Sequence, residues 1–349
     1  MFTLNKTPGR SVMVNGKEHL FFSGYSYLGI HHHPVFIKSL QESINEYGIF
    51  FPSSRISNTQ LCIYNEVETF LNHHFLQISN QYHTALFSNG FLSGLAAQKI
   101  FNHHKKIFIA PNTHPAISQH SINISRQSWV THLLNETQEN NYEKVLIKSD
   151  SVDVLKSSVN NFDFLKEIPK NCTVDVLIDD SHGIGLIGNN GTGIANFLPI
   201  QNNLQYHFNY SLSKSYGIPG GAFSSTKENI DKIKNTVEFA ATTPPIPAFL
   251  HSFLQHKELY SKQRELLVNN VIYFKEQITN LPILHQFPLP IFILPSFINE
   301  SIFIKHNLII SSFSYPSENG EKYTRIVLNA HHTKPDLEFL LSVLQQAFA

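Results

Sequence analysis

The sequence lacks an excess of charge of either sign. Lysine plus arginine and aspartate plus glutamate each number 26, so the formal net charge is zero, and only 15% of the 349 residues are charged. Nucleic acids and anionic membrane surfaces are bound through clusters of positive charge, and the chain has no basic run. The composition therefore predicts a protein with no nucleic-acid partner and no membrane partner.

Long apolar runs and cysteines are also scarce. No stretch approaches the roughly 18 apolar residues that a membrane-spanning helix needs, and residues 1–20 have neither the basic start nor the apolar core of a signal peptide. The two cysteines are Cys62 and Cys172, and a chain of this length does not depend on one disulfide for its stability. We therefore expect a cytoplasmic protein with reduced thiols.

Two patterns imitate ligand sites that their context does not support. The 20 histidines include several adjacent pairs, but metal sites on helices use histidines three or four residues apart, and the chain has no His-Glu-x-x-His pattern. Gly183, Gly185 and Gly188 have the spacing of a dinucleotide-binding turn, but polar residues separate them from the preceding strand-like run. We expect neither a metal ion nor a nicotinamide or flavin cofactor.

Strand-like and helical patterns alternate along the first two thirds of the chain. Apolar runs predict buried strands at residues 85–87, 107–110, 145–148, 174–178 and 205–210. This alternation is typical of an α/β fold, in which helices flank a mostly parallel central sheet. We predict that fold for the larger part of the protein.

A change of composition marks a second part of the chain. Residues 240–247 are rich in Ala, Thr and Pro, and a long helical pattern follows over about 249–278. A final helix is expected to start near 333–336, with an apolar stripe formed by Leu337, Leu340, Leu341, Leu344 and Phe348. We predict an N-terminal segment over 1–44, a large domain over 45–240 and a smaller α+β domain over 241–349.

One lysine lies between small residues, in the run Ser211-Leu212-Ser213-Lys214-Ser215-Tyr216-Gly217. A lysine that forms a Schiff base with an aldehyde cofactor needs small neighbours, which let a flat ring approach, and a dry setting, which lowers the pKa of its ammonium group. Lys214 is the candidate for this role. On this run alone, the alternative is a solvated loop lysine.

A second informative run ends in acids and a histidine. Residues 174–178 are mostly apolar, and Asp179, Asp180, Ser181 and His182 follow them. Ligands of parallel sheets bind just beyond the carboxyl ends of the strands. An acid at that place can keep a pyridine nitrogen protonated, as pyridoxal phosphate requires. The alternative is that the two acids only cap the next turn.

A candidate anion site follows the strand-like run at 85–87. Ser88-Asn89-Gly90 is a turn signal, and beyond it one face of a predicted helix contains Phe91, Leu92, Leu95, Ala96, Lys99 and Ile100. A phosphate at this turn would meet free amide groups and the positive end of the helix dipole. Most such turns bind nothing, so the signal is not specific by itself.

Two further residues have the chemistry of a binding site. Arg325, in the strand-like run 324–328, could hold a carboxylate with two parallel hydrogen bonds, and a surface ion pair is its alternative. His114 follows the run 107–110, where its imidazole could cover a pyridine ring or simply be exposed to water.

In their order and spacing, these motifs resemble the α-oxoamine synthase family of pyridoxal-phosphate enzymes, which have the type I fold of the aminotransferase superfamily. The resemblance extends over most of the chain, and the 8-amino-7-oxononanoate synthase branch is nearest in motif. The motifs that carry it are Tyr27-Leu28-Gly29, His33-Pro34, Tyr47-Gly48, Ser54-Arg55, Phe87-Ser88-Asn89-Gly90-Phe91, His114, Asp179-Asp180-Ser181-His182-Gly183, Ser213-Lys214, Pro244-Pro245 and Arg325.

The resemblance implies a role for each matching residue. Of the four catalytic residues that it implies, Lys214 would bind the cofactor aldehyde, Asp179 the pyridine nitrogen and His182 the phenolic oxygen. The fourth, His114, would stack on the ring. The cofactor phosphate would lie against Ser88, Asn89, Gly90, Phe91, Ser211 and Ser213, and, from the partner subunit, against Thr242 or Thr243. Arg325 would bind the substrate carboxylate, and Ser26 stands where the family has a substrate-side asparagine.

The resemblance also implies an activity and an assembly. The activity is the decarboxylating condensation of a small amino acid with an acyl-CoA, as in biotin biosynthesis, by a homodimer with its active site at the subunit interface. The chain departs from the family over 150–158, where a Ser-Met-Asp-Gly-Asp run is not preserved, and at several substrate-side positions. Two alternatives therefore stay open: an aminotransferase or lyase that does not use coenzyme A, and a catalytically inactive homologue that acts as a binding protein.

Overall fold

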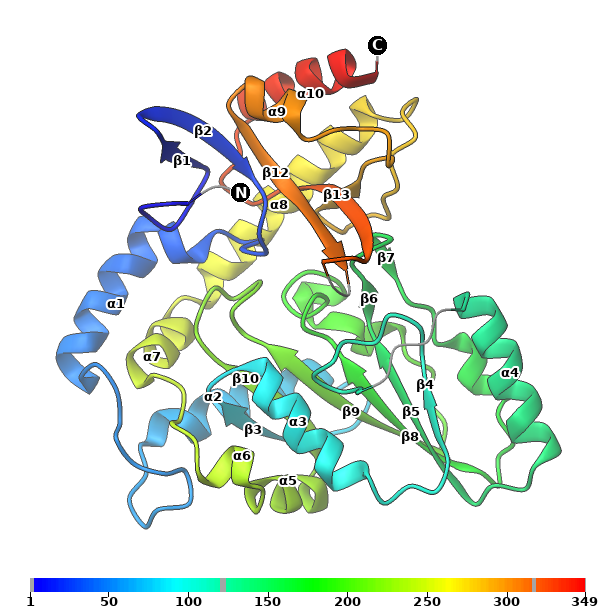
Figure 1. Ribbon diagram of the computed structural model, residues 1–349. Helices are drawn as coiled ribbons and strands as arrows, with labels where there is room; N and C mark the ends of the chain where they lie inside the picture. Colours follow the sequence, from blue (N-terminus) through cyan, green and yellow to red (C-terminus); the bar gives the residue numbers. More distant parts are fainter. Residues whose placement is uncertain (1–2, 120–123, 316–317, 349) are drawn as a thin grey trace.

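A six-stranded sheet forms the centre of the protein, in the strand order β3-β10-β9-β8-β5-β4 (Figure 1). The computed structural model describes residues 3–119, 124–315 and 318–348. The strands of this sheet are β3 (Tyr82–Phe87), β4 (Ile107–Ile109), β5 (Lys144–Asp150), β8 (Thr173–Asp179), β9 (Leu204–Ser211) and β10 (Gly221–Thr226). The five strands predicted from the sequence are confirmed, whereas β10 was not predicted.

The sheet is mostly parallel, as predicted. Strands β4, β5, β8 and β9 run parallel to one another, whereas β10 is antiparallel to both β3 and β9. Strand β8 is buried over almost its whole length, because apolar side chains on both of its faces are covered. Its Leu177 belongs to one core cluster, and Val174, Val176 and Ile178 belong to the other.

Helices cover both faces of this sheet. One face packs against α3 (Gly90–Phe101), α5 (Lys227–Lys234) and α6 (Val237–Ala240). The other face packs against α2 (Cys62–Asn72) and α4 (Arg126–Glu139), whose apolar side chains include Val67 and Trp129. The carboxyl ends of the parallel strands are left for the loops, which lie below the second sheet in Figure 1.

Helix α3 corrects one prediction. It begins where the turn signal placed it, but the expected apolar face is only partly right: Phe91 is 49% exposed, whereas Ala96 is buried and Leu92 and Ile100 pack against the core. Apart from Phe101, the buried residues of the helix are small or polar, and they include Gly90, Ser93 and Gly94. Close packing explains this: a Cβ on Gly94 would lie 2.6 Å from the carbonyl oxygen of Ala116, so only a hydrogen fits there.

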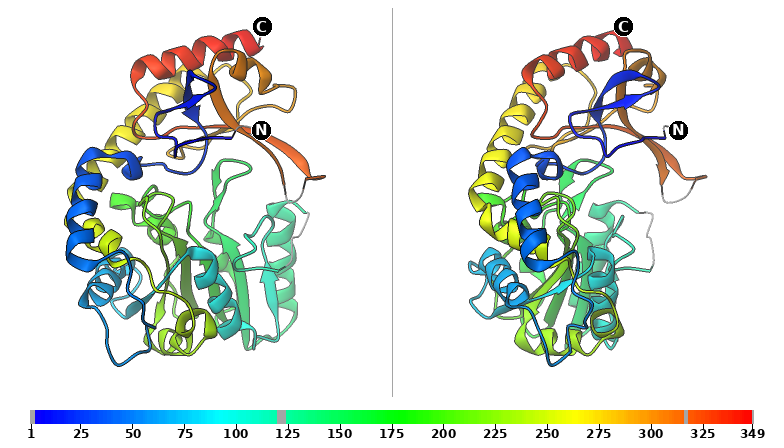
Figure 2. Two further views of the ribbon diagram at one scale, coloured as in Figure 1. Left: turned by 60° about the vertical axis from the view of Figure 1, so that its left-hand side comes forward. Right: turned by 90° about the vertical axis from the view of Figure 1, so that its left-hand side faces the viewer.

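A second sheet joins the two ends of the chain, in the order β1-β2-β12-β13-β11 (Figure 2). Its strands are β1 (Ser11–Val14), β2 (Lys17–Phe22), β11 (Ile291–Ile293), β12 (Leu308–Tyr315) and β13 (Glu321–Val327). Strand β2 is parallel to β12, so the predicted N-terminal segment shares a sheet with the predicted C-terminal domain. Two short strands, β6 (Val152–Asp153) and β7 (Ser158–Val159), form a separate hairpin.

Five more α-helices complete the described part of the chain. They are α1 (Pro34–Tyr47), α7 (Pro247–Gln255), α8 (Lys257–Gln277), α9 (Ser301–Lys305) and α10 (Lys334–Phe348). The single helix expected over 249–278 is interrupted at His256 and forms α7 and α8. Helix α8 rises from the lower sheet to the upper one in Figure 1, and α10 starts where the sequence predicted. Within the described ranges, no helix is long and apolar enough to cross a membrane.

Candidate active site

A cavity of about 210 Å³ lies at the carboxyl ends of β5 and β8. Ligands of parallel sheets bind at this edge, because the strand ends and their loops converge there. The second sheet closes the cavity from above with residues of β12 and β13. Its lining consists of Tyr25, Asn112, His114, Asp150, Asp153, Val154, Leu155, Asp179, His182, Lys214, Phe313, Tyr315 and Arg325.

Lys214 enters the cavity from the loop that follows β9. Its Nζ lies 2.7 Å from Nε2 of His182. Burial lowers the pKa of the Lys214 ammonium group, although the charges of Asp179 and Asp150 act in the opposite direction. A lowered pKa increases the fraction of neutral amine, which is the form that attacks an aldehyde.

His182 links Lys214 to the loop that follows β2. Burial, and then the charge of Lys214, lowers the pKa of His182 well below its usual value, so the ring is neutral. An ammonium group only donates, so Nε2 accepts from Lys214 and Nδ1 bears the ring proton. Nδ1 then donates to the hydroxyl oxygen of Tyr27, 2.7 Å away. Tyr27 is fully buried and fixes the orientation of the imidazole.

Asp179, the last residue of β8, lies beside a second acid that the sequence reading missed. Asp179 accepts hydrogen bonds from Nδ2 of Asn209 at 2.7 Å and from the amide of Ser181 at 3.0 Å. Asp150, the last residue of β5, is its partner in the strand register. Burial, and then the charge of Asp179, raises the pKa of Asp150 well above its usual value. The signal in the sequence was an acid at the carboxyl end of a predicted strand.

His114 lies on the loop after β4 and lines the same cavity. Its backbone amide donates to Oδ1 of Asp150 at 2.9 Å, and its Nδ1 accepts from the amide of Ala116 at 3.1 Å. Burial lowers the pKa of His114. The charge of Asp179 acts to raise that pKa, and the charge of Lys214 acts to lower it further. A neutral, fixed imidazole therefore stands next to the lysine and the acid.

The N-terminus of α3 forms a narrow cradle against β9. Asn89 caps the helix by accepting from the amide of Leu92 at 2.9 Å, and the first amides of a helix have no intrahelical partner. A Cβ on Gly90 would lie 2.9 Å from Cα of Ser211, so only glycine allows the two segments to approach. The hydroxyls of Ser211 and Ser213 lie 2.7 Å apart at this place. Amides, hydroxyls and the helix dipole together suit an anion.

Arg325 reaches the cavity from β13 and is only 1% exposed. Its Nη1 donates to the carbonyl oxygen of Val154 at 3.1 Å, and its Nη2 donates to the hydroxyl of Tyr25 at 2.7 Å. Nε is buried and has no hydrogen-bond partner among the described residues. The guanidinium also lies over the rings of Tyr25 and Phe313, at 5.1 and 4.8 Å from their centres. A buried cation with an unused donor suits a carboxylate ligand.

The structure does not bring every predicted residue to the cavity. Ser26 points away, because its hydroxyl lies 2.5 Å from Nδ1 of His31, and its neighbour Tyr25 lines the cavity instead. Thr242 donates to the carbonyl oxygen of Glu238 at 2.7 Å, and Thr243 is exposed. Neither threonine lines the cavity of its own chain.

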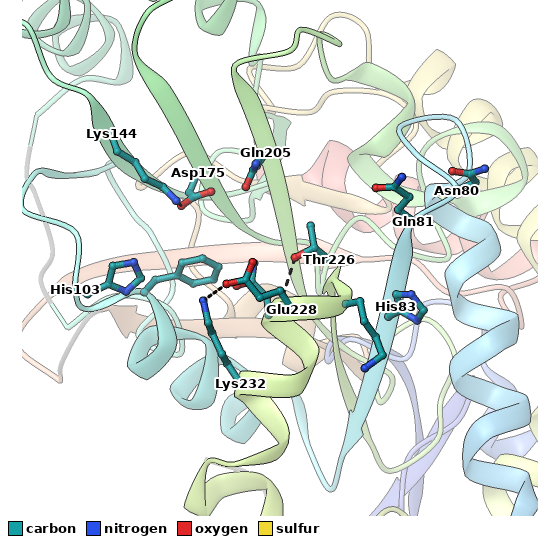
Figure 3. Close-up of a pocket in the computed structure, with 13 residues that line it drawn as sticks. Asn80, Gln81, His83, His103, Lys144, Asp175, Gln205, Thr226, Glu228 and Lys232 are labelled. Carbon is teal, nitrogen blue, oxygen red and sulfur yellow. Dashed lines mark hydrogen bonds and ion pairs between the residues drawn. The ribbon is translucent and has the colours of Figure 1, made fainter.

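A larger cavity of about 650 Å³ lies at the opposite end of the sheet (Figure 3). Its buried acid, Asp175, is bonded to His104 at 2.7 Å, to His207 at 3.1 Å and to Lys144 at 2.8 Å. Burial alone would raise the pKa of Asp175, but the hydrogen bonds from His104 and His207 hold it well below its usual value. The charges here neutralise one another, and the site faces the amino ends of the parallel strands. It is therefore the weaker candidate for catalysis.

Known proteins are similar to this chain in sequence and in fold. Residues 26–344 match the family described as aminotransferase class I and II. The 8-amino-7-oxononanoate synthase of Coprothermobacter proteolyticus is 24% identical over 356 residues, covering 95% of this chain and 88% of that protein. The serine palmitoyltransferase of Sphingobacterium spiritivorum is 26% identical over 370 residues, covering 97% and 88%.

A solved structure is similar in fold. Serine palmitoyltransferase from S. paucimobilis, with a bound aldimine of PLP (pyridoxal phosphate) and myriocin, has a TM-score of 0.81 at 17% identity, covering 99% of this chain and 92% of that one. The predicted resemblance, fold class and cofactor are confirmed by these matches. The chain belongs to the aminotransferase class I and II family, as a pyridoxal 5'-phosphate-dependent transferase of the α-oxoamine synthase type.

Proposed function

We propose that this protein condenses a small amino acid with an acyl-CoA thioester and releases carbon dioxide, as an 8-amino-7-oxononanoate synthase-like acyltransferase. The observation that supports this most directly is the meeting of Lys214, Asp179 and Arg325 in one cavity. The first two suit a pyridine aldehyde, and the third suits the carboxylate of an amino acid. Residues from two sheets must meet to form this set.

The residues of the site fit pyridoxal phosphate. The N-terminus of α3, where Gly90 packs closely against Ser211, suits its phosphate, and the buried amine of Lys214 suits its aldehyde. Asp179 is held in place by Asn209 and Ser181 and suits the pyridine nitrogen. His114 would cover the ring, and His182 would face the phenolic oxygen. Bound pyridoxal phosphate supplies an electron sink for charge that develops on the amino acid.

Arg325 would orient the amino acid through its carboxylate. Its Nε is the donor left for this purpose, and the hydroxyl of Tyr25 lies beside it. Lys214, with its lowered pKa, would then take the proton from the α carbon. His182 keeps the lysine aimed into the cavity through the 2.7 Å contact.

The overall reaction forms one carbon–carbon bond and breaks another, together with the carbon–sulfur bond of the thioester. The α carbon, having lost its proton to Lys214, would join the carbonyl carbon of the thioester, and the departing thiolate would take a proton from solvent to become the free thiol. The carboxylate then leaves as carbon dioxide, and a proton takes its place. Lys214 is the residue placed to return that proton.

The relatives leave the acyl group open. The name 8-amino-7-oxononanoate describes a product with a carboxylate at the end of its carbon chain, whereas serine palmitoyltransferase names an uncharged palmitoyl group. Both are condensations of an amino acid with an acyl group. The family resemblance supports a dimer, in which Thr242 or Thr243 would approach the partner's cofactor phosphate, and a location in the cytoplasm.

The test is a screen of small amino acids against acyl-CoA thioesters, measured by the release of free thiol. We expect thiol release that depends on both substrates and is lost in Lys214→Ala. Lys156→Ala is the matched control, because Lys156 is exposed and does not line the cavity. Activity that survives in Lys214→Ala would refute the role of that lysine.

The same preparation separates the alternatives. Conversion of the cofactor to its amine form by amino acids alone, with release of a keto acid, would show an aminotransferase. A protein that stays colourless with added pyridoxal phosphate would indicate an inactive homologue.

A further inference from the structure

A second cavity, of about 460 Å³, adjoins the candidate active site. Tyr25 lines both cavities and is the wall between them. On the other side, the cavity is lined by Ser213, the residue before Lys214, and by Ile218 and Pro219 of the same loop. Its volume is within the range of about 300–1,000 Å³ that is typical of small-molecule pockets.

The lining of this second cavity contains no lysine, arginine, aspartate or glutamate among the described residues. Small and apolar residues dominate it. Besides Ser213, Ile218 and Pro219, the lining consists of Thr7, Pro8, Gly9, Phe21, Ser23, Gly24, Tyr25, Ser26, His31, Gly217 and Asn329. An uncharged ligand can therefore enter without leaving a protein charge unpaired. A charged end group would find no ion partner there.

His31, the titratable base of the lining, is already engaged. Its Nε2 lies 3.0 Å from the carbonyl oxygen of Pro8, and its Nδ1 lies 2.5 Å from the hydroxyl of Ser26. A carbonyl only accepts, so Nε2 bears the proton, and Nδ1 accepts from the serine. Burial also lowers the pKa of His31. The ring is neutral and has no N–H free for a carboxylate.

Other cations nearby either form an ion pair already or line another cavity. Lys6 and Arg10 line a neighbouring cavity that shares Thr7 and Gly9, and Arg10 is 3.4 Å from the carboxylate of Asp336. In the active-site cavity, the lysine and the arginine of the lining are Lys214 and Arg325, and the proposed reaction uses both.

We infer that the second cavity binds the acyl chain of the thioester, and that the chain it accepts is an uncharged hydrocarbon rather than one that ends in a carboxylate. This inference rests on the proposed function and names the substrate class for it. The thioester carbonyl must reach the α carbon next to Lys214. The second cavity shares Tyr25 with the active-site cavity, and it is the adjoining space that an acyl chain would enter by passing that side chain. Placing a carboxylate in a site without an ion partner is unfavourable, because its hydration is lost without compensation.

The test uses two thioethers of coenzyme A that cannot react: the S-octyl thioether and the S-(7-carboxyheptyl) thioether. Calorimetry on the holoenzyme gives both dissociation constants without turnover. We expect the octyl compound to bind about tenfold more tightly, since an apolar pocket rejects an unpaired carboxylate. Equal binding, or tighter binding of the carboxyheptyl compound, would overturn the inference.

Variants at the mouth of the cavity test its location. Thr7 is exposed and lines the cavity. Its hydrogen bond with His32 is made by its backbone carbonyl, which accepts from Nε2 of His32, so Thr7→Trp should fill the space without disturbing the fold. We expect the octyl compound to bind about fivefold more weakly, because the tryptophan ring would take up part of the space in which the octyl chain is buried. Asn5→Trp is the matched control, because Asn5 is exposed on the same segment and lines only the neighbouring cavity. Equal effects of the two variants would place the chain elsewhere.

A variant with a gain of function completes the test. Thr7→Arg adds a cation at the mouth and should bring the two dissociation constants closer together, through tighter binding of the carboxyheptyl compound. No change in that ratio would count against the cavity. If no acyl thioester releases thiol in the activity screen, the proposed function fails, whereas the thioether measurements judge the cavity independently.

Discussion

Replacing Tyr25 with phenylalanine removes one hydroxyl from the candidate carboxylate site and keeps the ring. The oxygen of that hydroxyl accepts from Nη2 of Arg325 at 2.7 Å, so its hydrogen remains free to donate to a bound carboxylate. Tyr25 thus both orients the guanidinium and offers a second donor. The sequence resemblance pointed to Ser26 for this side of the substrate, and the structure places Tyr25 there.

The expected size follows from this contact. A hydrogen bond to a charged group contributes about 1.5–3 kcal/mol. Tyr25 is 40% exposed, so water replaces part of the lost bond, and the lower end applies. A loss of about 1.5 kcal/mol corresponds to roughly tenfold weaker binding of the amino acid.

The assay is a titration of the holoenzyme with an amino acid, followed by the absorbance of the cofactor. The corresponding amine without a carboxylate is the internal control, because it makes no contact with Arg325. Tyr315→Phe is the matched variant, since Tyr315 lines the same cavity. If Tyr25→Phe weakens the amine as much as the amino acid, or weakens neither, the assigned role of Tyr25 is wrong.

Three further predictions concern the cofactor site and the core. Gly90→Ala should raise the dissociation constant of pyridoxal phosphate about tenfold, as measured by fluorescence, because its Cβ would lie 2.9 Å from Cα of Ser211; unchanged affinity would refute the cradle. Asp179→Asn should weaken cofactor binding at pH 7 by about tenfold, whereas Asp150→Asn should change it by less than about threefold, because burial raises the pKa of Asp150 and so favours the uncharged acid, which an asparagine resembles; equal losses would contradict the assignment. Burial raises the pKa of Asp180 from 3.8 to about 7, so between these pH values the folded state retains a proton that the unfolded chain has lost. The free energy of unfolding therefore falls by about 4 kcal/mol as the pH rises from about 4 to 7. Asp180→Asn should remove most of this fall, so thermal unfolding at pH 5 and pH 8 should differ less in the variant than in the native protein; an unchanged pH dependence would refute this.

Local sequence patterns predicted those parts of the protein that depend on neighbouring residues. The apolar run that became β8 and the acids at its end indicated a strand with chemistry at its carboxyl edge. The turn at Ser88-Asn89-Gly90 predicted the start of α3. These predictions succeeded because burial on both faces and helix capping leave signals within a few residues. The buried face of α3 was predicted only in part, because small residues that allow close packing carry no hydrophobic signal.

The sequence by itself determined the fold class and the cofactor, and it predicted the residues that would anchor that cofactor. Only the tertiary structure decided that Tyr25 bonds to Arg325, which is 300 positions away, and that Asp150 is in register with Asp179. It also decided that an uncharged cavity adjoins the lysine. The physical reason is that such contacts depend on how the two sheets pack, and the residues that meet there have no common pattern along the chain.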